Sequence, residues 1–144
     1  MIEQDTIRLL RECDAGIKMG VASIDDMLPY VSSQDLKRML SSCKNEHITL
    51  KDEIQKLLDK YHDDGKEPAA MAKGMSWLKT NVKLVLDESD NTIAGLMTDG
   101  CNMGIKSLHK YLNEYKAADE ASKDIARKLA FLEENLVTNV RKFL

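Results

Sequence analysis

The chain has 144 residues, of which 43% are hydrophobic, 31% charged and 5% aromatic, and its formal net charge is −3. This length is enough for one domain with a core of its own, which we expect to span residues 1–144. Positive and negative residues are interleaved and no apolar run is long enough to cross a bilayer, so we expect neither a nucleic-acid partner nor a membrane partner.

The first predicted helix runs from about Asp5 to Leu28, where hydrophobic residues recur every three or four positions. Pro29 ends it, because proline lacks an N–H group and its ring clashes with the preceding turn. Asp14 is the polar member of the predicted buried face, which consists of Ile7, Leu10, Asp14, Ile17, Val21, Ile24 and Leu28.

The second predicted helix opens with Ser32, and Asp35 three positions later gives it a start that resembles a capping box. His47 is the polar member of its buried face, which otherwise consists of Leu36, Leu40, Cys43, Leu50, Ile54, Leu57 and Tyr61. The helix is expected to end near Asp63, with Gly65 in the left-handed conformation that commonly closes a helix.

Residues 69–87 are predicted to form a further helix within a long connection, because hydrophobic residues recur there at helical spacing. These residues are Met71, Met75, Leu78, Val82 and Val85. Trp77 and Leu84 lie seven positions apart and off that stripe. We expect them either to pack over the seam of a bundle or to form an apolar edge at which a homo-oligomer assembles.

The last two predicted helices run from about Ser89 to Tyr115 and from about Asp119 to the C-terminus. Their buried faces consist of Ile93, Met97, Cys101, Gly104, Leu108, Tyr111 and Tyr115, and of Ile125, Leu129, Leu132, Leu136, Val140 and Phe143. Short connections join antiparallel neighbours, whereas a long connection can travel the length of a bundle. Short, long and short connections therefore predict an all-α, up-down-down-up four-helix bundle.

Two helical hairpins joined by a long crossover resemble the ferritin-like superfamily, most of all its uncharacterised bacterial members without a complete di-iron site. The resemblance implies a di-iron site with a carboxylate from each of two helices and Glu-x-x-His from each of the other two. His47, however, follows Lys44 rather than glutamate at that spacing, and Glu133 precedes Leu136 rather than histidine. We therefore expect no bound metal. The weak candidates for ligands of iron or zinc are Asp14, His47, Cys101 and Glu133.

Asp14 and His47 interrupt apolar faces that come level in an antiparallel hairpin. We expect a hydrogen-bonded pair that fixes the register of the two helices, because burying either group alone costs a few kcal/mol. The alternatives are local water or an exposed groove, and a remnant metal site that includes Cys43 or Cys101.

Two pairs of glycines are spaced by four residues, Gly16 with Gly20 and Gly100 with Gly104. Glycine within a helix costs about 0.5–1 kcal/mol relative to alanine, so these positions need a compensating advantage. We expect them either to let two helices approach closely or to leave room for a bulky neighbour such as Trp77.

Motifs of catalysis are missing from the sequence, which has no Gly-rich phosphate loop and no His-Glu-x-x-His. We therefore assign no catalytic residue and expect a non-enzymatic interaction or structural protein. Its expected location is the cytoplasm, where three cysteines without close pairing would stay reduced. The alternatives are a metal-binding or oxidative-stress protein with a degenerate ferritin-type site, and a small-ligand binder in the bundle core.

Overall fold

The computed structural model describes residues 3–68 and 89–144, and every regular element in these ranges is a helix. The elements are α1 (Gln4–Met27), the short 3-10 helix η1 (Leu28–Tyr30), α2 (Gln34–Lys60), α5 (Asp90–Glu114), α6 (Glu120–Val140) and the short 3-10 helix η2 (Arg141–Phe143). The predicted all-α class is therefore confirmed. None of these helices is both long and apolar enough to cross a bilayer. The helix predicted for residues 69–87, with Trp77 and Leu84, lies outside the described residues.

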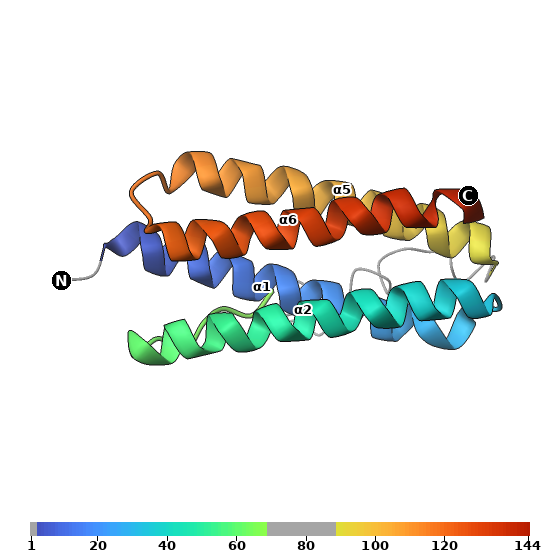
Figure 1. The fold of residues 1–144 in the computed structure, drawn as a ribbon, viewed down its shortest axis with the longest axis horizontal. Coiled ribbons are helices and arrows are strands. Elements are labelled where there is room, and N and C mark those ends of the chain that lie inside the picture. The colour runs from blue at the N-terminus through green and yellow to red at the C-terminus, as the bar shows by residue number, and fades with distance from the viewer. Residues whose placement is uncertain (1–2, 69–88) are drawn as a thin grey trace.

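The four long helices lie lengthwise against one another as a bundle (Figure 1). α1 and α6 run in one direction, and α2 and α5 run in the opposite direction. α1 and α2 form one hairpin around η1, and α5 and α6 form a second hairpin around residues 115–119. Contacts between helices are most extensive within the hairpins, and α6 also packs on both α1 and α2.

α2, α5 and α6 each begin after a residue whose side chain accepts a hydrogen bond from a backbone N–H group of the first turn. The capping residues are Ser33, Ser89 and Asp119. Such a cap satisfies one of the N–H groups that the first helical turn leaves without a partner. The cap of α2 is therefore Ser33 rather than the predicted Ser32, whose N–H group donates to the carboxylate of Asp90.

α2 ends in a Schellman motif, so the predicted ending at Gly65 is wrong. His62 takes the left-handed conformation, with φ of 56°, and its N–H group donates to the Asp59 carbonyl oxygen over 3.1 Å. The N–H group of Asp63 donates to the Leu58 carbonyl oxygen over 2.9 Å, which completes the motif. Gly65 is also left-handed, with φ of 80°, but it lies in the segment that follows.

The segment that follows α2 lies along α1. Ion pairs join the two: Arg11 with Asp63, Glu12 with Lys66, and Lys18 with Glu67. Exposed ion pairs of this kind contribute little individually, about 0–1 kcal/mol each. Their consequence is geometrical, because they hold the backbone of Lys66 beside the middle of α1.

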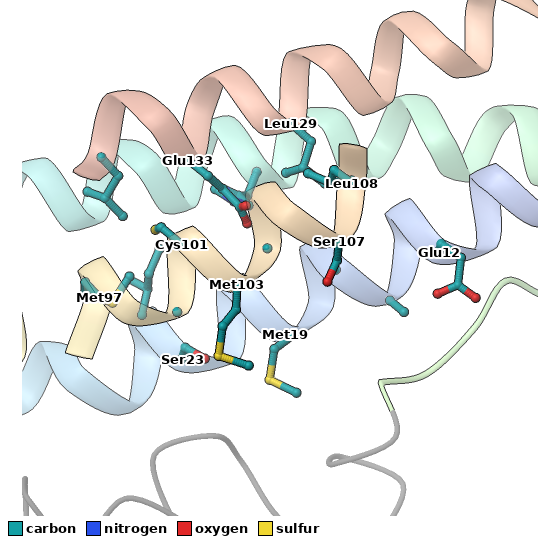
Figure 2. A pocket seen from close by; sticks show the side chains of 18 of the residues that line it. Glu12, Met19, Ser23, Met97, Cys101, Met103, Ser107, Leu108, Leu129 and Glu133 are labelled. Atoms are coloured by element: carbon teal, nitrogen blue, oxygen red, sulfur yellow. The ribbon is translucent and has the colours of Figure 1, made fainter. Parts of the chain in front are cut away.

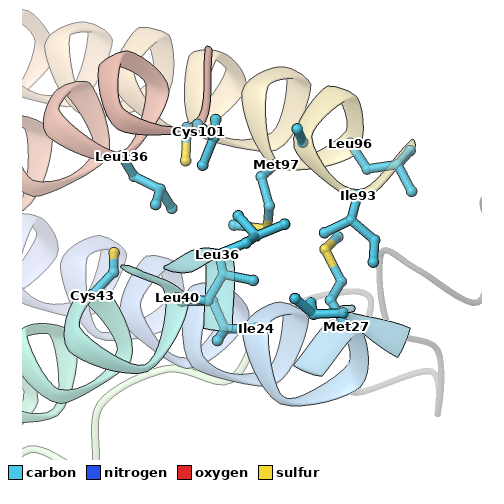
Figure 3. Packing of buried hydrophobic residues seen from close by; sticks show 13 residues of the cluster. Ile24, Met27, Leu36, Leu40, Cys43, Ile93, Leu96, Met97, Cys101 and Leu136 are labelled. Carbon is cyan, nitrogen blue, oxygen red and sulfur yellow. The ribbon is translucent and has the colours of Figure 1, made fainter. Parts of the chain in front are cut away.

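The core consists of two apolar clusters, one in each half of the bundle. The cluster near η1 includes Ile24, Leu36, Leu40, Ile93 and Leu136 (Figure 3), and the other includes Leu9, Ile17, Ile54, Leu58 and Leu129. Complete burial of one such side chain contributes about 1.5–3 kcal/mol. Leu58 is the fully buried residue near the end of α2, and the predicted core residue Leu57 only packs against the cluster.

Hydrogen bonds between the two hairpins join them at both ends of the bundle. At the end with η1, the Asp90 carboxylate accepts from the N–H groups of Ser32 and Ser33, over 2.9 and 3.0 Å. At the opposite end, Oγ1 of Thr6 accepts from the N–H group of Asp119 over 2.9 Å. The start of α5 is thereby held beside the start of α2, and the start of α6 beside the start of α1.

Candidate functional site

A layer of small and polar residues separates the two apolar clusters. Each helix contributes one residue to it: Gly20 in α1, His47 in α2, Gly104 in α5 and Glu133 in α6. A Cβ atom built on Gly20 would lie 3.3 Å from Nε2 of His47, and one built on Gly104 would overlap the carboxylate of Glu133. In this central layer, each polar side chain therefore faces a glycine of a neighbouring helix.

His47 is 2% exposed, and its ring is oriented by its own helix. Nδ1 lies 2.8 Å from the carbonyl oxygen of Cys43, and because a carbonyl oxygen can only accept, Nδ1 carries the proton of this bond. Burial lowers the pKa of His47, and the bond to Cys43 only partly opposes that change. The ring is therefore neutral near neutral pH, and Nε2 presents an acceptor lone pair toward Gly20.

Glu133 is 8% exposed, and its Oε2 atom has no hydrogen-bond partner within residues 3–68 and 89–144. Burial raises the pKa of this carboxyl group from 4.5 to about 8, so the protonated form predominates at neutral pH. A buried polar atom without a partner costs about 1–3 kcal/mol. The carboxyl group is accommodated only because position 104 carries no side chain.

A cavity of about 350 Å³ lies between α1 and α5 and reaches the central layer (Figure 2). Its wall is mostly apolar and includes Met97, Leu108 and Leu129. Glu12 and Glu133 are the charged side chains among the described residues that line it, and none of these lining residues is lysine or arginine. The Glu133 carboxylate points from α6 toward α5 in Figure 2.

The cavity contains the two glycine pairs that the sequence singles out. Its lining includes Gly16, Gly20, Gly100 and Gly104. The nearest neighbours of a Cβ atom on Gly20 or Gly104 would be side chains from α2 or α6, not the backbone of the other glycine-bearing helix. At Gly20 and Gly104 the described residues therefore show no close approach of α1 and α5, and a cavity lies between these helices instead. The alternative, room for a bulky neighbour such as Trp77, lies outside the described residues. Paired glycines on two facing helices were the signal in the sequence that could have revealed this cavity.

Asp14 and His47 are both buried, as predicted, but the predicted hydrogen bond between them is wrong, because each has other partners. In an α-helix the Cα–Cβ bond leans toward the N-terminus of its own helix. His47 lies beside Gly20, six residues after Asp14 in α1, so the two side chains do not come level. Because α1 and α2 are antiparallel, the side chains also lean away from each other. Asp14 leans toward the open end of the hairpin, whereas His47 leans toward η1.

Asp14 instead contacts the ammonium group of Lys18 and the backbone N–H group of Lys66. Its Oδ2 atom lies 2.8 Å from Nζ of Lys18 and accepts from the N–H group of Lys66 over 3.0 Å, whereas Oδ1 has no partner among the residues described. A Cβ atom on Gly65 would overlap Oδ2, so the glycine is required there for contact as well as for its left-handed φ of 80°. Asp14 does not line the cavity and has a structural role.

The candidate metal ligands are only partly brought together. His47, Cys101 and Glu133 line the cavity, whereas Asp14 is paired with Lys18 outside it. Among the described residues, no group of three or more His, Cys, Asp or Glu side chains is arranged to hold a metal ion. A ferritin-type di-iron centre needs several carboxylates and two histidines. The donors in the described part of the chain do not fit such a centre.

The cysteines Cys13, Cys43 and Cys101 are buried and unpaired. Burial raises the pKa of Cys13 and Cys43 to about 12 and also raises the pKa of Cys101. Because the thiolate is the form that attacks electrophiles and binds metals, these thiols behave as small apolar groups. Cys43 and Cys101 accordingly lie in the cluster near η1 (Figure 3).

The cavity therefore joins an apolar wall to two polar groups, the acceptor Nε2 of His47 and the carboxyl group of Glu133. A concave apolar site with a few convergent polar groups is the arrangement that proteins use to bind and orient small molecules. Compared with protein-family models, with curated proteins and with solved structures, the chain has no match among them.

Proposed function

We propose that this protein binds a small, mainly apolar molecule in the cavity between α1 and α5. The observation that carries the proposal is the carboxyl group of Glu133, which is 8% exposed, lines the cavity and has no partner for Oε2 in the part of the chain that the structure describes. A hydrogen-bond donor on a bound molecule would remove the cost of that unpartnered atom. Binding would therefore gain from one polar contact in addition to apolar burial.

The size of the cavity supports the same proposal. Its volume of about 350 Å³ falls in the range of roughly 300–1,000 Å³ that is typical of ligand sites. An engineered cavity of roughly 150 Å³ is enough to hold benzene. By proportion, this cavity has room for a ligand of roughly a dozen non-hydrogen atoms.

The proposal includes a ferritin-like type of bundle. The directions of the four helices support this, as does a polar layer in the middle of the bundle, where facing helices of such proteins build their sites. The helix predicted for residues 69–87 would complete the crossover. The function differs from that of the iron proteins, because here an apolar cavity takes the place of their cluster of carboxylates.

Binding of 4-phenylbutan-1-ol, an uncharged probe of suitable size, tests the proposed function by isothermal titration calorimetry. We expect saturable binding of one probe per chain to the wild-type protein. Ser107 lines the cavity and is partly exposed, so Ser107→Phe should fill the cavity without unfolding the helix. This variant should weaken binding at least about tenfold, which corresponds to about 1.4 kcal/mol.

The matched control is Ser42→Phe, the same substitution at an exposed position of α2 outside the cavity. It should leave the affinity for the probe within about twofold of wild type, or about 0.4 kcal/mol. Equal binding by folded Ser107→Phe and wild-type protein would show that the probe binds elsewhere. Failure of the wild-type protein to bind any probe of this size would reject the proposed function.

A further inference from the structure

We infer that the ligand of this cavity is a primary alkylamine or arylalkylamine whose ammonium group binds the carboxylate of Glu133. The inference rests on the proposed function and adds the chemical class of the ligand. It depends on which polar groups reach the cavity and on the sign of their charge.

The polar groups of the central layer accept hydrogen bonds. Nδ1 of His47 donates to the Cys43 carbonyl oxygen, which leaves Nε2 as an acceptor toward Gly20 and the cavity. Oε2 of Glu133 has no partner among the described residues, and once the carboxyl group has lost its proton it is an acceptor only. An ammonium group is complementary to this pair, because it has three N–H donors and no acceptor.

The charged residues around the cavity favour a cation. Glu12 and Glu133 are acidic, and no lysine or arginine belongs to the described lining. Glu12 is already paired with Lys66, so a ligand carboxylate would meet no available basic side chain among the described lining residues, whereas an ammonium group could pair with Glu133. A hydroxyl group could hydrogen-bond to Glu133, which is protonated at neutral pH, but it carries no charge that could pair with the ionised carboxylate. A metal ion is disfavoured because the described residues do not group three suitable donors.

Binding of an ammonium group should also displace a proton. Burial raises the pKa of Glu133 to about 8, whereas the ammonium group pairs with the ionised carboxylate, so one proton is released to the buffer. The titratable groups near Glu133 are Cys13 from α1, Cys43 and His47 from α2, and Cys101 from α5. The thiols stay protonated and the buried histidine stays neutral, so Glu133 is the source of the proton.

The test compares three probes with one apolar body: 4-phenylbutylamine, 4-phenylbutan-1-ol and 4-phenylbutyrate. At neutral pH we expect the amine to bind the full chain at least about tenfold more tightly than the alcohol, and the carboxylate more weakly than either. Glu133→Gln keeps the shape of the side chain but not its charge. It should remove the preference for the amine, so that amine and alcohol bind with affinities within about threefold of each other.

The control is Glu134→Gln, which changes the exposed neighbour on the same helix and should retain the full preference for the amine. Calorimetry in buffers of different ionisation enthalpy should show release of nearly one proton at neutral pH. The release should approach zero at about pH 9.5, where Glu133 is already ionised and an alkylammonium is still largely protonated.

The outcomes separate the inference from the proposed function. If the alcohol or the carboxylate binds as tightly as the amine, or if Glu133→Gln keeps the amine preference, the inference fails while the binding function stands. If none of the probes binds the wild-type protein, both fail. A preference for the amine without proton release would place the ammonium group away from Glu133 and would also overturn the inference.

Discussion

Asp14 and Glu133 are two buried carboxyl groups of the same bundle, and each presses against a glycine of another segment, Gly65 and Gly104 respectively. Asp14 is paired with the ammonium group of Lys18 and accepts a backbone N–H group. Glu133 has no such partner in the described ranges and borders a cavity. A buried acid with a cation beside it supports the fold, whereas one beside an empty space is available to a ligand.

The largest loss of stability should come from removing Asp14, the buried carboxyl group that is paired with Lys18. Asp14→Ala leaves the Lys18 ammonium group, whose side chain is 17% exposed, without its buried partner. Removing one member of a buried ion pair typically costs 3–5 kcal/mol, and since Lys18 can still reach Glu67, we expect a loss of about 3 kcal/mol. Urea unfolding at neutral pH measures it.

The control for that variant is Asp52→Ala, which removes an exposed carboxylate of α2. Its unfolding free energy should lie within about 0.5 kcal/mol of wild type. If Asp14→Ala were as mild as this control, the ion pair with Lys18 would have no structural importance and the contrast with Glu133 would disappear.

The second prediction concerns Glu133 and how the stability of the protein depends on pH. The pKa of Glu133 is about 8 in the folded protein and 4.5 without burial, so the folded state holds the extra proton between these values. Its contribution to stability is complete below pH 4.5 and is lost as pH rises through about 8. Between pH 6.5 and 8 the unfolding free energy should fall by about 1–2 kcal/mol, because the slope is close to 1.4 kcal/mol per pH unit at the lower end and about half of that at pH 8.

The measurement starts at pH 6.5 because below this value His47 makes stability rise with pH, whereas Glu133 makes it fall. Its lowered pKa means that stability is lost as pH falls below 6.5, when the unfolded state takes up a proton that the folded state excludes. Glu133→Gln should flatten the profile between pH 6.5 and 8. A slope that persists in this variant would assign the effect to another group.

The smallest predicted effect distinguishes the glycines of α5. Gly104→Ala forces the Glu133 carboxyl group to move, and we expect a net loss of about 1 kcal/mol. Gly95→Ala meets no atom within 4 Å and should gain about 0.5–1 kcal/mol from helix propensity. In a Glu133→Ala background, Gly104→Ala should change sign and become stabilising. Equal effects in the two backgrounds would show that the glycine and the carboxyl group do not share this space.

The positions of the long helices could be predicted to within one or two residues at most ends because the amphipathic period is local. The burial of Asp14 and His47 followed from the same period. Their partners did not follow, because the lean of a side chain is set by helix direction and Lys66 comes from the segment after α2. The cavity also depends on two helices that are far apart in sequence. Only the glycine spacing hinted at it.

The hydrogen bonds between the hairpins fix how far one hairpin is shifted along the other. The N–H groups of Ser32 and Ser33 are satisfied by Asp90, and that of Asp119 is satisfied by Thr6, so each hairpin completes the other. Sliding one hairpin along the other by a single turn would shift them by about 5.4 Å and break the bonds at both ends together. The apolar clusters alone would tolerate several such offsets. The end bonds allow only one, and that one brings Gly20 and His47 of the first hairpin level with Gly104 and Glu133 of the second, around the cavity.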